Sequence, residues 1–174
     1  LHGKTAEEMK PVVRITTSDT GSGGANIYPM LVSGSENTTI NLGSPLRLGH
    51  RNGTRIAEFD AHLKLLYGKY QLAVGNLTRL LGIVVVNPVN CMKGVMDKLG
   101  IPRKYEAEAV DLFVAQYGET PCTAHEIYFG ISEILYMLAC EGEEGSRITR
   151  MEETIARALS VNWTEFDIPG AYKW

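Results

Sequence analysis

The sequence predicts an α+β protein, in which a small antiparallel β-region of two to four strands precedes a bundle of about five helices. Residues 11–53 contain short runs of β-branched residues separated by glycine, serine and asparagine, as strands and turns do. After residue 54 the apolar residues recur at spacings of three and four, which is the period of a helix. The chain has 174 residues, 44 % of them hydrophobic and 21 % charged, which suits a compact globular fold.

We expect one domain over residues 1–174. Its parts are a polar lead-in (1–10), a β-rich part (11–53), a helical part (54–160) and an aromatic C-terminal tail (161–174). No apolar run approaches the ~20 residues of a membrane-spanning helix, so no membrane partner is predicted. The cysteines are odd in number and widely spaced, which favours a reducing, cytoplasmic location.

The strand candidates in the β-rich part are PVVRITT, NIYPMLV and TTINL. The segments between them, SDTGSGGA and SGSEN, supply the residue types that turns need. Pro29 lies inside the second run and cannot donate a backbone hydrogen bond. We therefore expect this strand to lie at an edge of the sheet or to contain a bulge.

A long central helix is predicted over residues 55–82. Its inward face is formed by residues that alternate spacings of three and four, namely Ile56, Phe59, Leu63, Leu66, Tyr70, Ala73, Leu77 and Leu80. An alternative is that Gly68 or Gly75 ends one helix and begins the next.

Small residues recur every seven positions on the opposite side of this helix, at Ala61, Gly68, Gly75 and Gly82. A glycine inside a helix costs about 1 kcal/mol relative to alanine, and close approach of another backbone would offset that cost. The flanking residues are apolar, namely Leu65, Leu72, Val74 and Leu81. A helix with two apolar sides is central or meets another subunit, so we expect a homo-oligomer with the four small residues in its interface.

Four shorter helices are expected after the long one. The first has Asn87 as its cap, Pro88 at its first position and Gly100 as its terminator. The second lies between Pro102 and Gly118. Thr123 and Glu126 form the capping box of the third, which Gly142 ends, and Ser146 caps the fourth.

The aromatic tail contains both tryptophans of the chain. Large rings at a terminus indicate that the tail docks onto a surface, either on its own core or on a partner. Trp163, Phe166 and Trp174 are therefore candidate interface residues.

A basic cluster makes nucleic acid an alternative partner. The net charge of −3 excludes a general attraction for polyanions. Locally, however, a phosphate could be bound by Arg47, His50, Arg51 and Arg55.

The alternative from the enzyme class is a thiol enzyme or redox switch at Cys122 and His125. A thiol next to a helix N-terminus is favoured as the thiolate, and the histidine could act as its base. Together with Cys91 and Cys140 these residues also form a zinc-type ligand set. One unbroken helix would separate Cys122 from Cys140 by about 27 Å, which excludes a shared ion.

Two further motifs occur in one loop. Asp19-Thr20-Gly21-Ser22 matches the active-site string of aspartic proteases, but the helical remainder of the chain does not suit that class. The glycines at 21–24 could face a phosphate, although no nucleotide-binding fingerprint is complete. No cofactor is predicted.

Several strings, RITTSDTGSGGANIYP, NPVNCMKGV, TPCTAHEIYFGISEIL and ARALSVNWTEFDIPG, resemble a phage/plasmid-like family of unknown function. The resemblance implies a cytoplasmic bacterial protein of a mobile element, with DNA as a candidate partner. It assigns no functional residues. The leading hypothesis is a non-enzymatic protein that self-associates and binds a macromolecular partner.

Overall fold

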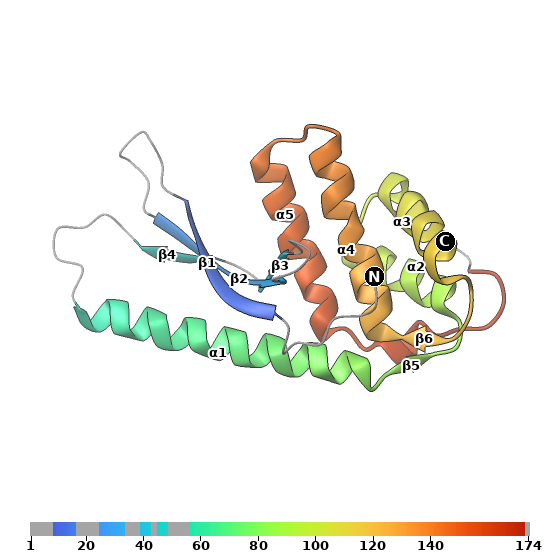
Figure 1. The fold of residues 1–174 in the computed structure, drawn as a ribbon, viewed down its shortest axis with the longest axis horizontal. Helices are drawn as coiled ribbons and strands as arrows, with labels where there is room; N and C mark the ends of the chain where they lie inside the picture. The colour runs from blue at the N-terminus through green and yellow to red at the C-terminus, as the bar shows by residue number, and fades with distance from the viewer. Residues whose placement is uncertain (1–8, 17–24, 34–38, 43–44, 49–55, 173–174) are drawn as a thin grey trace. The chain divides into compact units, whose positions relative to one another are not determined.

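A computed structural model describes residues 9–16, 25–33, 39–42, 45–48 and 56–172 (Figure 1). Within these ranges, a four-stranded sheet comes first and the five α-helices follow, so the predicted α+β class is confirmed. The chain divides into two compact units. We call the described residues up to Gly75 the sheet unit and those from Asn76 the helical unit, and each is treated by itself. The single domain stays a prediction.

Four described strands form the sheet of the sheet unit. They are β1 (Met9–Thr16), β2 (Ala25–Ser33), β3 (Thr39–Asn41) and β4 (Leu46–Leu48). The middle strand is β2, which pairs with β1 on one side and with both β3 and β4 on the other. All three pairings are antiparallel, as the sequence predicts.

Pro29 lies in this middle strand rather than at an edge of the sheet. Residues 30–32 pair with β3 and residues 25–27 pair with β4, so Pro29 falls between the two ladders. Its carbonyl accepts a hydrogen bond from the backbone N–H of Leu42 at 2.9 Å. The backbone of Pro29 therefore faces the β3 side, at the one place where the strand changes partners and neither ladder needs an N–H group.

Helix α1 (Ile56–Leu81) runs without a break past Gly68 and Gly75, which confirms the long helix. Its expected inward face is buried at Leu66, Ala73, Leu77 and Leu80. The hydroxyl of Tyr70 donates a hydrogen bond to the carbonyl of Val12, which fixes the helix against β1 within the sheet unit. The side chains of Ile56 and Phe59 lie outside the described part of the chain.

Leu63 departs from the prediction, because 48 % of its surface is exposed. It lies at the margin of the buried stripe, where the curved surface of a helix turns away from its neighbour.

The helical unit contains the four shorter helices, α2 (Pro88–Leu99), α3 (Arg103–Tyr117), α4 (Ala124–Cys140) and α5 (Gly145–Ala156). Two single-turn 3₁₀ helices follow, η2 (Arg157–Ser160) and η3 (Trp163–Glu165). Two short strands, β5 (Val84–Val85) and β6 (Cys122–Thr123), pair antiparallel with each other. Large side chains that are fully buried form the core, among them Leu77, Leu80, Met92, Met96, Phe113, Ile127, Tyr128, Ile131, Ile134, Leu138 and Trp163.

Several predicted helix ends are confirmed. Gly100 and Gly118 have φ values of 73° and 70°, which glycine adopts without strain. In the capping box, the N–H of Glu126 donates to the Thr123 hydroxyl at 3.3 Å, and the N–H of Thr123 donates to the Glu126 carboxylate at 2.8 Å.

The predicted cap of α5 is wrong, because the helix begins at Gly145 and Glu144 is the capping residue in place of Ser146. The N–H groups of Arg147 and Ile148 donate to the Glu144 carbonyl at 2.9 Å and 3.2 Å. The first turn therefore closes on a residue that precedes the serine.

Candidate interaction surfaces

The side of α1 opposite the buried stripe is apolar and exposed. Leu65 and Leu72 expose 57 % and 66 % of their surface, and Ala61, Gly68 and Gly75 are exposed as well. These five residues follow one another at spacings of four and three, which is the pattern of a coiled-coil seam. We call them the Leu–Gly face.

The glycines of this face have open space in front of them. A Cβ atom built on Gly68 or on Gly75 would meet no atom within 4 Å. Inside the described part of this chain, therefore, nothing requires glycine at either position, and the loss of helix propensity is not offset. Leaving two leucines in water adds to the cost, since apolar surface gains about 25 cal/mol per Å² when it is buried.

The Leu–Gly face ends at Gly75. One turn later the Arg79 guanidinium donates hydrogen bonds to the carbonyls of Leu159 and Val161, at 2.8 Å and 3.3 Å, within the helical unit. Gly82, the fourth predicted small residue, follows the end of α1, and a Cβ there would lie 3.5 Å from the Arg79 carbonyl. Only three of the four predicted small residues therefore belong to one open surface.

Arg47 is the one member of the basic cluster within the described residues, where it lies in β4 opposite Asn26. His50, Arg51 and Arg55 lie outside them.

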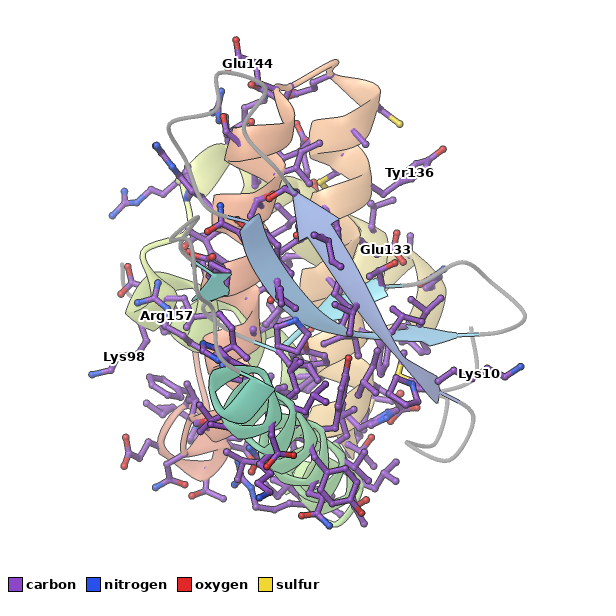
Figure 2. All side chains as sticks on the ribbon, turned by 90° about the vertical axis from the view of Figure 1, so that its left-hand side faces the viewer. Lys10, Lys98, Glu133, Tyr136, Glu144 and Arg157 are labelled. Atoms are coloured by element: carbon purple, nitrogen blue, oxygen red, sulfur yellow. The ribbon has the colours of Figure 1, made fainter. Side chains whose placement is uncertain are left out.

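Sequence reasoning missed two other basic residues, both on β1. The Arg14 guanidinium lies 5.0 Å from the ring centre of Tyr28, the residue paired with it on β2. Lys10 lies nearer the start of the same strand, and its side chain points away from the sheet (Figure 2). The alternation of Lys10, Val12 and Arg14 in the sequence already places the two basic residues on one face of a strand. Only the strand register, however, shows where Arg47 lies relative to them.

The geometry gives thiol catalysis no support. Burial raises the pKa of the Cys122 thiol to about 12, and the negative charges of Glu126 and Asp167 add to this shift. A thiol nucleophile needs the opposite shift. His125, its candidate base, is buried in α4 with its ring centre 4.8 Å from that of Phe129.

The other two cysteines differ in their surroundings. Cys91 is buried, and burial raises its pKa to about 12, whereas Cys140 is exposed at the end of α4. Within residues 9–172, apart from the stretches that are not described, no group of three histidine, cysteine or acidic side chains is arranged to hold a metal ion. The motifs at residues 19–24 lie outside the described residues.

The aromatic tail packs on its own chain. Trp163 is fully buried, and its indole N–H donates to the carbonyl of Ala158 at 3.1 Å. Phe166 lies on Gly94 of α2, where an added Cβ would come within 2.6 Å of the ring. Two of the three candidate interface rings therefore contact the helical unit itself, and Trp174 lies outside the described residues.

Asp167 fixes the tail to the N-terminus of α2. Its carboxylate accepts hydrogen bonds from the backbone N–H groups of Val86 and Asn87, at 3.0 Å and 2.7 Å, and from the Asn87 side chain at 2.9 Å. Burial alone would raise the pKa of Asp167, but these hydrogen bonds outweigh it and lower the pKa. Asn87 was predicted as the cap, yet the side chain that accepts these hydrogen bonds belongs to Asp167, 80 residues further along the chain.

Glu106 is a buried carboxyl group in α3 with 1 % of its surface exposed. Its Oε2 atom has no hydrogen-bond partner among the described residues. Burial raises the pKa of Glu106, Asp97 raises it further, and Arg103 partly opposes them.

Comparisons of the chain with protein-family models, with curated proteins and with solved structures gave no match. Among the helices of the described residues, none combines the length and the apolar character that crossing a membrane requires.

Proposed function

We propose that this chain is a non-enzymatic protein that self-associates through the Leu–Gly face of α1. The observation that supports the proposal most directly is an exposed Leu72 between two glycines that have open space in front of them. A second helix on this face would bury the leucines. Because glycine has no side chain, the backbone of that helix could also approach closely. Both costs that the isolated chain bears would then be offset.

The small residues suit an unusually close pair of helices. Helix axes normally lie 8–10 Å apart, a separation that the contacting side chains set. With glycine or alanine at alternate positions of the seam, a leucine of one copy lies over a glycine of the other. The seam contains no charged residue, so no buried ion has to be paired.

Substitution of Gly75 by leucine tests this packing. A Cβ added at Gly75 meets no atom of the described residues within 4 Å, whereas a leucine there would occupy the space of a partner's backbone. We expect native mass spectrometry to show fewer assembled copies of Gly75→Leu than of the wild type. Gln71→Leu is the matched control, since it adds the same side chain to an exposed position outside the seam. Equal assembly of all three proteins would contradict the proposal.

The cellular location and the origin of the protein are part of the same proposal. The resemblance to phage/plasmid-like proteins supports a cytoplasmic bacterial protein of a mobile element. An assembly that presents many copies of one surface would suit the binding of a macromolecular partner.

Nucleic-acid binding is the second candidate function, favoured by the register of the sheet. Arg14 on β1 is paired with Tyr28 of β2, and Arg47 on β4 is paired with Asn26, two residues away on the same strand. Basic residues on the two strands that flank an aromatic residue suit a phosphate backbone with stacked bases. His50, Arg51 and Arg55 of the predicted cluster belong to this proposal as well.

Fluorescence anisotropy with labelled single- and double-stranded DNA tests this second function. We expect binding that weakens steeply as salt rises and weakens further in Arg14→Ala. Arg150→Ala, an exposed arginine of α5, is the matched control. Absence of binding to either DNA at low salt would end the hypothesis.

A further inference from the structure

The outer edge of β1 has the backbone groups of an unpaired strand. Among the described residues, β1 pairs only with β2, along its whole length of eight residues. A long exposed edge strand is a template for pairing with another chain, and most proteins shorten, cover or charge such edges. Val13 and Ile15 expose 45 % and 62 % of their surface on this strand.

The register shows which groups face outward. In an antiparallel sheet, alternate residues direct both backbone groups to one side. The Pro29 carbonyl bonds to Leu42 on the β3 side, so residues 26, 28, 30 and 32 of β2 face β1. Their partners are residues 10, 12, 14 and 16, which leaves the backbone groups of residues 9, 11, 13 and 15 facing outward.

The proline of this strand fits the same alternation. Pro11 is one of the outward residues, so the ladder with β2 does not need its missing N–H group. Its outward carbonyl can still accept a hydrogen bond. Val13 and Ile15 can each donate and accept on the same edge.

We infer that β1 pairs antiparallel with the β1 strand of a second copy of this chain, about a two-fold axis at Val13. In this register the N–H of Val13 donates to the Val13 carbonyl of the other copy. The N–H of Ile15 donates to the other copy's Pro11 carbonyl. Every hydrogen bond is made twice by the two-fold axis, and none requires an N–H group from Pro11.

The side chains in this register favour a second copy as the occupant. Val13 meets its own equivalent, and Ile15 meets Pro11, so apolar residues lie opposite apolar residues. The two positive charges meet no like charge, since Arg14 lies opposite Val12 and Lys10 lies opposite Thr16. The strand is thus complementary to itself in hydrogen bonding and in the pairing of its apolar side chains, and no two positive charges lie directly opposite each other.

The strand interface goes beyond the proposed helix interface and uses different residues. A chain with two different two-fold interfaces forms assemblies larger than a dimer, either a closed tetramer or an open-ended series of copies. Removing either interface leaves dimers held by the other one, which allows the two proposals to be tested separately.

Val13→Pro is the sharpest test, because it removes an outward N–H group and leaves the ladder to β2 intact. We combine it with Leu72→Glu, which places a charge in the Leu–Gly face. Val13→Thr, which keeps the N–H group and the branched shape, is the matched control. Native mass spectrometry should show dimers for Leu72→Glu and for Leu72→Glu/Val13→Thr, but monomers for Leu72→Glu/Val13→Pro.

Hydrogen exchange supplies a second readout in the Leu72→Glu protein. The N–H groups of Val12 and Arg14 should be protected at every concentration, because they face β2. Those of Val13 and Ile15 should become protected only as the protein is concentrated.

The outcomes separate the two proposals. If Leu72→Glu is monomeric while the wild type assembles, or if Val13→Pro leaves the dimer intact, the strand interface is refuted. If Leu72→Glu assembles as the wild type does and Val13→Pro abolishes assembly, the strand interface stands and the helix interface fails. A monomeric wild type refutes both.

Discussion

At the scale of single residues, the glycines of this chain fall into two groups. Gly94 and Gly130 lie under aromatic rings, with an added Cβ only 2.6 Å from Phe166 and 2.8 Å from Phe113. Gly68 and Gly75 lie in open space. Glycine is therefore explained by packing at the first two positions, whereas the other two are explained by nothing within the described residues.

Replacing Gly94 by alanine tests the docking of the tail. The added methyl group must displace the Phe166 ring, and overpacking of this kind costs about 1–3 kcal/mol. We expect a loss of that size in the free energy of unfolding, measured by denaturant titration. Gly145→Ala is the control, because a Cβ there meets nothing within 4 Å. If both variants are equally stable, the tail does not lie on α2.

Glu106 gives stability a pH dependence of predictable sign. Its folded-state pKa is raised, chiefly by burial, so the folded protein favours the neutral acid. Its contribution to stability is therefore complete below the unfolded pKa of about 4.3 and is lost as the pH rises through the folded pKa. Glu106→Gln should be more stable than the wild type at neutral pH, with the difference shrinking toward pH 4.

Denaturant titrations from about pH 4 to about pH 8 would measure this difference. The control is Glu108→Gln, an exposed carboxyl group on the same helix, which should show no such trend. If the free energy of unfolding of the wild type increases relative to that of Glu106→Gln as the pH rises, the carboxylate has a partner in the fold.

At the scale of elements, Asp167 acts on the N-terminus of α2. A carboxylate there accepts N–H groups that the helix cannot pair and lies at the positive end of its dipole. Asp167→Asn should cost about 1 kcal/mol and loosen the tail. Because the folded pKa of Asp167 is lowered, this contribution exists above about pH 3.9 and is lost as the pH falls further.

Thermal unfolding monitored by tryptophan fluorescence would measure the loss. Glu165→Gln, two residues earlier and exposed, should change the melting temperature much less. Equal effects of the two substitutions would contradict a specific role of Asp167 at α2.

The elements also show what a sequence can predict. The capping box of Thr123 and Glu126 and the long period of α1 depend on neighbours within one or two turns, so both were predicted. Asp167 could not be assigned to α2, because its hydrogen bonds join residues 80 and 81 positions apart. β4, β5 and β6 have two or three residues each, too few to show an alternation.

The candidate surfaces divide in the same way. The Leu–Gly face was predictable, since one helix brings its residues together at heptad spacing. The pairing of Arg14 with Tyr28 and the outward edge of β1 were not, because both depend on which strand pairs with which and in what register. The hydrogen bond from Leu42 to the Pro29 carbonyl, together with the register, shows which backbone groups of β1 face outward.

At the scale of the whole molecule, self-association is the central claim. Native mass spectrometry of the wild-type chain, beside Gly75→Leu and its control Gln71→Leu, tests it most directly. The account predicts assemblies at whole multiples of the chain mass for the wild type and the control, and a shift to smaller assemblies for Gly75→Leu. A wild type that is monomeric at every concentration tested, or a Gly75→Leu protein that assembles as the wild type does, would contradict it.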